Sequence, residues 1–460
     1  MNSKERKAIE EKSETISNEM FQLVEELYPI CRSITGDGVR QTLEILKKEI
    51  PIQIHEIPTG EKVFDWIIPK EWNIKDAYII DPNGKKIVDF KESNLHVLNY
   101  SIPINQKISL SELKKHIHTI PEKPNVIPYV TSYYSENWGF CMTHNNFLDL
   151  KEGEYEIVID SKLENGSLTY GEFFIPGKSE FEILLSCYVC HPSMCNDNLS
   201  GVVLLTEIAK YIKNIKNNYS IRFIFVPETI GAITWIKQNE ENLTKIKHGL
   251  VATCIGDSGK FTYKKSRQGN TEIDETVIRI LKKSKLNFKT VDFFPWGSDE
   301  RQFCSPGFDL PIGSLMRSMY GTKDFPEYHT SADNLEFINK KSLEESFVKY
   351  LEIIESLEEN FLEKDICKTE INRNKNSKIY QNLIQKCEPQ LGKRGIYRIL
   401  GGQNNNFEKR KYEFAIFWVL NLSDGTHSLK DISDRSNISL KLIEKAADVL
   451  IEKNLLKKLQ

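Results

Sequence analysis

The residues best suited to chemistry are two histidines and several carboxylates that follow apolar, strand-like segments of the sequence. His191 and Asp197 lie in CHPSMCNDNLSG, directly after EILLSCYV. Glu228 follows SIRFIFVP, and the segment EYHTSADN, which contains His329 and Asp333, comes shortly after LPIGSLMR. Three N or O ligands, an open water position and a carboxylate base make up a catalytic zinc site. These residue types therefore point to hydrolysis by a metal-activated water.

Each of these residues also has a simpler explanation. A single loop histidine is more often a surface or hydrogen-bonded core residue, and Asp197 could cap the helix predicted to begin near Leu199. Glu228 favours a site, because a carboxylate at the tip of a buried strand has to be paired, metal-bound or functional. The segment GSDERQF, which follows the strand-like FKTVDFF, adds Asp299 and Glu300 to the candidates.

The elements that must position these residues begin at Glu182. From there, short apolar segments alternate with amphipathic segments, which predicts crossover units, a largely parallel sheet and helices on both faces. A helix over residues 341–361 closes this unit. Loops that leave the carboxyl ends of parallel strands meet at one edge of a sheet, so we expect the four loops to form one site. The predicted fold class is α/β, with a mixed sheet flanked by helices.

The remaining sequence predicts two further modules. We assign residues 1–63, which read as two helical segments and the strand IQIHEIP, to the catalytic domain together with residues 174–370. Residues 64–173 contain short strand-like runs with turn signals, which predicts an inserted, mostly β domain. Residues 371–460 begin with the polar linker INRNKNSK and end in helical segments spaced as in a winged helix-turn-helix. The stretch YVTSYYSENWGF of the insertion could line a specificity pocket, although such aromatics are more often core.

Five motifs together resemble the zinc-dependent aminopeptidases of the bacterial leucyl aminopeptidase and glutaminyl cyclase type. They are CRSITGDGVR, CHPSMCNDNLSG, PETIGAI, WGSDERQF and EYHTSADNLE, which span residues 31–336. More closely, the whole chain resembles an aminopeptidase-like family in which a zinc-exopeptidase-like domain carries an inserted small β domain and a C-terminal winged helix. Members of that family often sit among genes for surface-polysaccharide biosynthesis.

The resemblance implies a role for individual residues. The matched metal ligands are His191, Asp197 and His329, and Glu228 matches the catalytic Glu. In the two-metal aminopeptidases a second, metal-binding Glu follows the catalytic one, and this chain has Thr229 there. The strand HGLVATCIG should also bring an Asp two residues before its final glycine, and this chain has Cys254 there. One zinc ion is therefore expected, with two as the alternative.

Further residues are candidates for supporting roles in the implied mechanism, in which Glu228 takes a proton from a zinc-activated water and passes it to the leaving amine. Asp257 and Asp333 are candidates for an additional metal ligand or for contacts around the ligands. Asp299 and Glu300 are candidates for binding the free amino group of a peptide or aminoacyl substrate. Arg32 could bind a substrate carboxylate bidentately or form a structural salt bridge.

Other functions remain open from the sequence. The two replaced ligands favour an inactive, ligand-binding regulator with a DNA-binding winged helix, whereas Glu228 favours an enzyme. The hydrolysed amide could also belong to a modified sugar or lipid precursor in surface-polysaccharide biosynthesis. We give little weight to haem attachment at Cys187-x-x-Cys190-His191, to a thiolate zinc site that includes Cys195, and to a cysteine nucleophile.

Composition narrows the class of protein. The chain has 460 residues, of which 40% are hydrophobic and 28% charged, with 62 Lys and Arg against 65 Asp and Glu. This balance is typical of a globular protein, and the net charge of the whole chain gives no indication of a charged partner. The first twenty residues lack the apolar core of a signal peptide, and no segment has the length of a membrane span. We therefore expect a cytoplasmic protein without a membrane span, whose nine cysteines are mostly free thiols.

The tail differs from the rest of the chain in charge. Residues 371–460 contain 17 Lys and Arg against 9 Asp and Glu, whereas the whole chain has a net charge of −3. The helix in SLKLIEKAADVLIEKNL offsets its lysines with acidic residues and has an apolar face at helical spacing. Sequence-specific DNA binders concentrate Lys and Arg on the helix that enters the groove. We therefore favour docking of this module on the catalytic domain or another subunit over nucleic-acid binding, and we expect a homo-oligomer.

Overall fold

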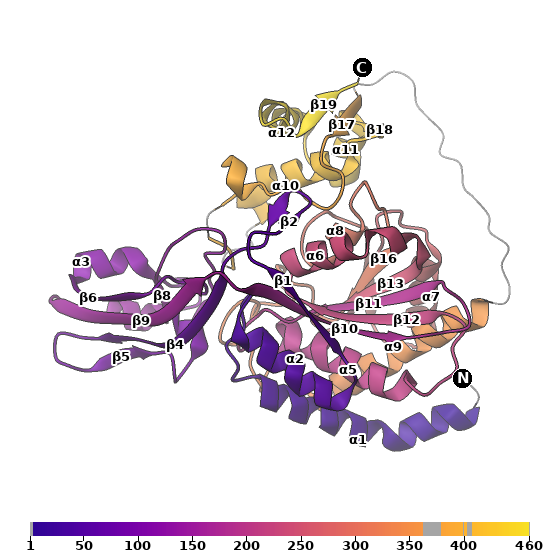
Figure 1. Ribbon diagram of the computed structural model, residues 1–460, viewed down its shortest axis with the longest axis horizontal. Coiled ribbons are helices and arrows are strands. Elements are labelled where there is room, and N and C mark those ends of the chain that lie inside the picture. Colours follow the sequence, from indigo (N-terminus) through magenta and orange to yellow (C-terminus); the bar gives the residue numbers. More distant parts are fainter. Residues whose placement is uncertain (1–2, 362–378, 399, 403–406, 460) are drawn as a thin grey trace.

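The computed structural model describes residues 3–361, 379–398, 400–402 and 407–459. Within these residues the largest sheet has eight strands in the order β1-β10-β12-β11-β13-β16-β14-β15 (Figure 1). Their bounds are Gln53–Pro58, Ser167–Ile175, Ser220–Val226, Glu182–Tyr188, Ile246–Ala252, Ile312–Met316, Phe261–Lys264 and Phe288–Val291, in that order. The four strands β12, β11, β13 and β16 run parallel. Strand β10 is antiparallel to both of its neighbours, and β14 is antiparallel to β16. The predicted α/β class with a mixed sheet is confirmed.

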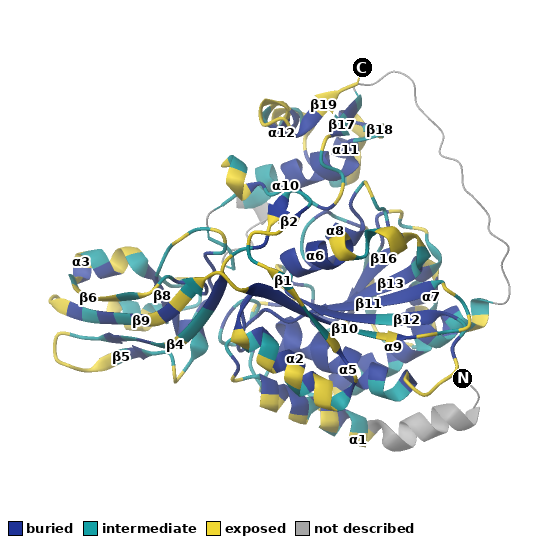
Figure 2. Cartoon of the chain, viewed as in Figure 1, coloured by how far each residue is buried: buried dark blue, intermediate teal, exposed yellow. Residues whose placement is uncertain are grey.

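The central strands are apolar because helices cover both faces of the sheet. Every residue of β11 is buried, as are nearly all of β12 and β13 (Figure 2). One core cluster joins the sheet to α1, α2, α5, α7 and α9, and a second joins it to α6 and α8. These helices span Ser3–Leu27, Asp37–Glu49, Ser200–Ile212, Glu272–Lys283, Lys340–Asn360, Ile230–Gln238 and Glu300–Phe303. No helix in the described part of the chain combines the length and the apolar composition needed to cross a membrane.

The structure differs from the sequence prediction in the direction of one strand. The segment FKTVDFF forms β15, which is parallel to β14, and β14 is antiparallel to β16. The carboxyl end of β15 therefore points away from the edge at which β11, β12, β13 and β16 end. The chain after β15 nevertheless returns to that edge, because Asp299 Oδ1 accepts a hydrogen bond from the Thr229 backbone N–H just beyond β12, at 2.7 Å.

The insertion forms its own antiparallel sheet, which projects from the body of the molecule at the left of Figure 1. Its order is β5-β4-β9-β6, and the strands span Lys86–Asp89, Glu71–Ile80, Glu154–Glu164 and Ile104–Ser109. Short pairs β2–β3 (Lys62–Val63, Trp66–Ile67) and β7–β8 (Ile117–His118, Phe140–Cys141), and the helices α3 (Leu110–Leu113) and α4 (His144–Leu148), complete the region. The strand β10 follows directly and belongs to the large sheet, so the boundary predicted at residue 173 falls within a strand of the catalytic domain.

The C-terminal module has the predicted winged-helix arrangement. Its helices α10, α11 and α12 span Phe407–Leu422, Leu429–Ser436 and Leu440–Glu452, and its sheet has the order β18-β17-β19, with bounds Asp424–Ser428, Ile379–Asn382 and Leu456–Lys458. Ile443, Ala446, Ala447 and Leu450 form the buried face of α12, as the apolar spacing predicted. The linker INRNKNSK and the predicted boundary at residue 371 lie outside the described residues.

This module docks on both other parts of the chain. The Phe414 ring of α10 stacks on Trp296 of the catalytic domain with ring centroids 4.1 Å apart. Arg267 of the catalytic domain reaches Asp424 at 2.6 Å, and Arg394 reaches Asp65, which lies next to β3, at 2.5 Å. These ion pairs are partly buried, and together with the stacked rings they give the docking a defined orientation. Docking on the catalytic domain, which the sequence favoured, is thus present within one chain.

We expect the full chain not to shift mixed duplex DNA in a gel-shift assay at physiological salt. The helix α12 would have to enter the groove, and its exposed Lys441 and Lys445 are interspersed with Glu444 and Asp448. A face of mixed sign releases few counterions from phosphates, and this release supplies most of the affinity of non-specific binding. A sequence-selective shift that weakens steeply with added salt would contradict this expectation and favour a regulator.

Candidate metal centre and cavity

The site lies where the four parallel strands end. His191 follows β11, Glu228 follows β12, Cys254 follows β13, and the chain after β16 leads to His329. Thr229, Cys254 and His329 all have positive φ, at 64°, 52° and 55°. Such conformations are unfavourable for non-glycine residues and persist only where the surrounding structure enforces them. The backbone at this edge is therefore held in place by its neighbours.

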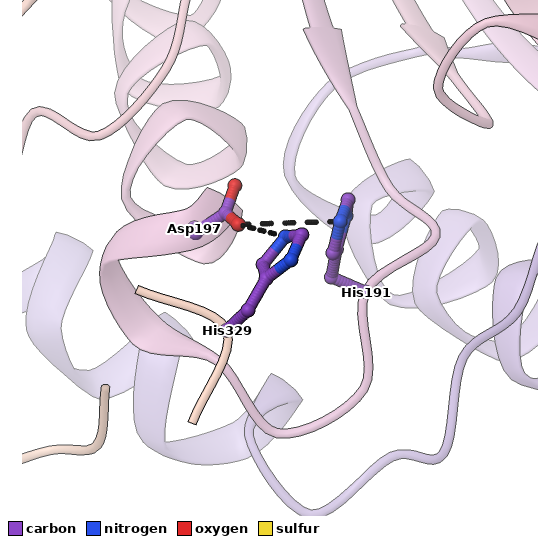
Figure 3. A group of neighbouring side chains, drawn as sticks. All are labelled: His191, Asp197 and His329. Atoms are coloured by element: carbon purple, nitrogen blue, oxygen red, sulfur yellow. Dashed lines mark ion pairs between the residues drawn. The ribbon is translucent and has the colours of Figure 1, made fainter. Parts of the chain in front are cut away.

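His191, Asp197 and His329 converge as a buried or nearly buried cluster, with one potential ligand atom from each lying within 4.8 Å of the others (Figure 3). Asp197 Oδ2 lies 3.0 Å from His329 Nε2 and 4.0 Å from His191 Nε2. The Gly402 carbonyl, which can only accept, lies 2.6 Å from His329 Nδ1, so Nδ1 carries a hydrogen and Nε2 is the nitrogen that faces Asp197. A carboxylate oxygen and an imidazole nitrogen 3.0 Å apart are joined by a proton or by a cation between them.

The protonation state of His191 suits a ligand. Burial lowers its pKa to about 4, so the imidazole is neutral near pH 7. The neutral ring is the form that binds a metal ion. The cluster therefore offers two imidazole nitrogens and a carboxylate oxygen, which is a ligand set that fits zinc.

Contacts around the cluster fix the position of Asp197. The Tyr188 hydroxyl donates to Asp197 Oδ1 and lies 2.6 Å from the Thr253 hydroxyl. Asp333 accepts hydrogen bonds from the backbone N–H groups of Asn196, at 2.6 Å, and of Asp197, at 2.9 Å. Asp333 is thus oriented toward the backbone of the loop and acts as a positioning residue.

Asp257 belongs to the same supporting layer. Its Oδ2 accepts from Asn196 Nδ2 at 2.8 Å, and its Oδ1 accepts from the Ser318 hydroxyl at 2.6 Å. The sequence left two roles open for Asp257 and Asp333: an additional metal ligand, or a contact that supports the ligands. The geometry favours support for both, since their carboxylate oxygens are hydrogen-bonded within the protein.

Glu228 lies beside the cluster and faces a cavity. Its Oε2 is 3.8 Å from His191 Nε2, and its backbone N–H donates to Cys190 Sγ at 3.2 Å. Burial first, and then the charges of Asp299 and Asp197, raise the pKa of Glu228 well above its usual range. Strongly perturbed carboxyl groups of this kind are common at catalytic sites, which makes Glu228 the candidate for a general acid or base.

Asp299 and Glu300 do not face the cavity, in contrast to the role predicted for them. Asp299 is fully buried, with Oδ1 bound to the Thr229 N–H, and burial raises its pKa to about 7. Glu300 forms a fully buried ion pair with Lys264 at 2.5 Å. Neither residue is among the described residues that line the cavity. Both side chains point into the protein because the chain after β15 returns to the edge of the sheet at which the parallel strands end.

Arg32 is buried beneath the His191 loop. Its Nε donates to the His191 carbonyl at 2.9 Å and its Nη1 to the Leu27 carbonyl at 2.7 Å. Arg32 is only 1% exposed and is absent from the described lining of the cavity. The predicted contact with a substrate carboxylate is therefore replaced by hydrogen bonds that fix the backbone of His191.

The cysteines near the site are structural. Cys187, Cys190 and Cys195 are buried free thiols, and burial is the main factor that raises the pKa of each. A neutral thiol is a weak nucleophile and a poor metal ligand. In the described residues, the group that could hold a metal contains histidines and an aspartate and no cysteine. This burial argues against the haem, thiolate and nucleophile alternatives.

The cavity beside Glu228 has a volume of about 570 Å³ and is enclosed by all three parts of the chain. The catalytic domain contributes Trp296 and Arg301 together with the site residues. The insertion contributes Tyr129, Tyr133 and Tyr134, all from the aromatic stretch noted in the sequence. The C-terminal module contributes a further set, which includes Glu388, Tyr397, Gly402, Arg410 and Phe414.

Three of these residues were missed by reasoning from the sequence. Arg301 lies in the motif WGSDERQF directly after Glu300, so its place in that motif was the available signal. Glu388 and Gly402 stand in segments without a motif, and they reach the site only because the C-terminal module docks there.

Comparison with known proteins agrees with this structure. Residues 21–360 match the family described as "Domain of unknown function (DUF4910)", and residues 378–458 match a winged helix-turn-helix. A Clostridium acetobutylicum protein, named as a candidate polysaccharide biosynthesis protein with an aminopeptidase-like domain, is 54% identical over 452 residues, or 98% of each chain.

Solved structures give the same result for the fold. A crystal structure of a candidate peptidase from Clostridium acetobutylicum is 52% identical, covers 99% of both chains and has a TM-score of 0.75. A zinc aminopeptidase from Bacillus subtilis is 12% identical, with a TM-score of 0.56 over 75% of this chain and 95% of its own, which shows a shared fold. The resemblance found in the sequence is therefore confirmed. The chain belongs to the DUF4910 family, with an aminopeptidase-like fold followed by a winged helix-turn-helix module.

Proposed function

We propose that this protein is a zinc-dependent hydrolase that cleaves an amide bond next to a free amino group. The observation that carries the proposal is the convergence of His191, Asp197 and His329 beside Glu228, with one potential ligand atom from each within 4.8 Å of the others. This arrangement suits a metal ion, and the cavity gives a substrate access to the same place. The aminopeptidase-like fold agrees with the proposal.

In this proposal His191, Asp197 and His329 hold the zinc ion. Zinc, when bound, would acidify water and polarise the carbonyl group of the scissile bond. Glu228 takes the proton of the attacking water and then gives it to the leaving amine. Tyr188, Asp333 and the Gly402 carbonyl keep the ligands in place, and the walls of the cavity limit the access of bulk water.

We propose a single zinc ion. Thr229 and Cys254 stand where the resemblance expects carboxylates of a two-metal site. The Thr229 hydroxyl accepts a hydrogen bond from Arg301 at 2.7 Å, and burial raises the pKa of the Cys254 thiol well above its usual range. A cationic guanidinium and a neutral thiol make poor surroundings for a second cation.

We propose a peptide or aminoacyl small molecule as the substrate. The name of the 54% identical relative favours a second candidate, in which the amide bond belongs to a precursor of a surface polysaccharide. Amino-acid anilides and aminoacyl sugars, tested side by side with the purified protein, distinguish the two.

The metal content is the first test. We expect protein that has been loaded with zinc and dialysed to retain one equivalent per chain, because three ligands converge on one place. A chelator should remove the metal and abolish hydrolysis, and added zinc should restore both. Elemental analysis that finds two equivalents would contradict the single-ion site, and none after loading would contradict the site itself.

Glu228→Gln should reduce turnover of amino-acid anilides by about 10²–10⁴-fold, which is the usual contribution of a general base. The zinc content should stay at one equivalent, since Glu228 lies beside the ligand cluster and is not one of the three ligands. The exposed Glu452→Gln is the matched control and should keep wild-type turnover. If Glu228→Gln loses zinc together with activity, Glu228 is a ligand and the assignment is wrong.

Asp333→Asn should weaken zinc affinity about 10–100-fold, as is typical for residues that orient metal ligands. An amide can accept only one of the two backbone hydrogen bonds, and its own N–H group would face the other donor. Zinc affinity is measured by competition with a chromophoric chelator, with the exposed Asp434→Asn as control. Equal affinities of the two variants would show that Asp333 does not position Asp197.

A further inference from the structure

An amide hydrolase that recognises a free amino group needs a hydrogen-bond acceptor for the ammonium group inside its cavity. Asp299 and Glu300, the carboxylates expected to do this, are turned into the protein. Among the described residues that line the cavity, the carboxylates are Glu228 and Glu388. Because Glu228 is required as the base, Glu388 is the carboxylate available for the substrate.

The backbone of Glu388 is fixed at the junction of the three parts of the chain. Its N–H donates to Gln302 Oε1 of the catalytic domain at 3.0 Å. Its carbonyl accepts from Trp66 Nε1, at the base of the insertion, at 2.8 Å. Both polar groups of the peptide unit are thus held by different domains, which fixes the direction in which the side chain leaves the backbone.

Arg301 links the Glu388 carboxylate to the catalytic residues. Its Nη2 lies 3.4 Å from Glu388 Oε1 and donates to the Thr229 hydroxyl at 2.7 Å, and Thr229 follows Glu228 directly. The Glu388 side chain is 18% exposed and lines the cavity, as Arg301 does. The carboxylate therefore lies on the cavity wall and is linked through Arg301 to the residue that follows the base. Burial raises the pKa of Glu388, and the charge of Arg301 beside it opposes this shift.

Aromatic rings also line this cavity. Trp296 and Phe414 are stacked on each other, and both line the wall. A substrate group that carries an ammonium next to an apolar or aromatic side chain fits these surroundings, since the ring faces bury the apolar part and the carboxylate pairs with the charge.

We propose that Glu388, which is contributed by the winged-helix module, binds the ammonium group of the substrate. The module is then a substrate-binding part of the enzyme. The inference rests on the proposed function, because it names the residue that recognises the free amino group in the same reaction.

Ligand binding tests this inference without turnover. The zinc-loaded full chain with Glu228→Gln serves as the background, and isothermal titration calorimetry measures phenylalanine amide and N-acetylphenylalanine amide, which differ in the charge of the amino group. We expect phenylalanine amide to bind about tenfold or more tightly than the acetylated compound, because it alone can form a charge-assisted hydrogen bond with Glu388. Adding Glu388→Gln should bring this ratio close to one, whereas adding Glu452→Gln should leave it unchanged.

Two further measurements guard against a merely structural effect. The Glu388→Gln variant should keep the zinc content and the thermal unfolding temperature of the Glu452→Gln control. Glu388→Asp, which retains the charge on a shorter side chain, should preserve part of the preference. A purely structural role would not produce this dependence on charge.

Several outcomes would overturn the inference. They are equal or tighter binding of the acetylated amide, a preference that survives Glu388→Gln, and failure of both amides to bind. N-acetylphenylalanine, which carries a carboxylate, is titrated as a third ligand. If it binds more tightly than phenylalanine amide, this wall of the cavity binds an anion through Arg301 and the inference is overturned. If the preference for the free amine depends on Glu388 but the wild-type protein shows no turnover, only the proposed function is contradicted. Turnover of anilides that is insensitive to Glu388→Gln would contradict only the inference about Glu388.

Discussion

The contact on which the site depends is the 3.0 Å approach of Asp197 Oδ2 to His329 Nε2, whose side chains are 1% and 13% exposed. A carboxylate buried in this way is unfavourable unless a positive charge pairs with it. The surrounding contacts hold both groups in place. Asp333 accepts two backbone N–H groups of the Asp197 loop, and Gly402 fixes the tautomer of His329.

This constraint explains why the three parts of the chain are packed as one unit. The His329 carbonyl accepts from the backbone N–H of Tyr129 in the insertion, at 2.9 Å. The Gly402 carbonyl, in the module matched as a winged helix, binds the other side of the same histidine. Thr131 pairs with Gly401 and so joins the insertion to that module directly. A winged helix that is used in this way has a structural function within the site.

The sequence predicted those residues whose position follows from local rules. His191, Asp197 and Glu228 lie in the loops that follow strands buried on both faces, and parallel strands bring such loops to one edge. Asp299 was misplaced because no local pattern shows that β14 and β15 run antiparallel to the central strands. For Arg32 the sequence left a substrate contact and a structural role open, because a guanidinium that binds two backbone carbonyls has the same sequence signature as one that binds a substrate.

The feature that could be predicted least from the sequence is the electrostatics of the site. Burial raises the pKa of both Glu228 and Asp299; the charges of Asp299 and Asp197 add to the shift at Glu228, and those of Glu300 and Glu388 add to the shift at Asp299. Arg301 opposes both shifts, and it is ion-paired in turn with Glu388 of the C-terminal module. One of the charges that act on the proposed base therefore belongs to a cation whose own partner lies in another domain. No local pattern in the sequence shows such an arrangement, so the electrostatics of the site follow from the tertiary structure.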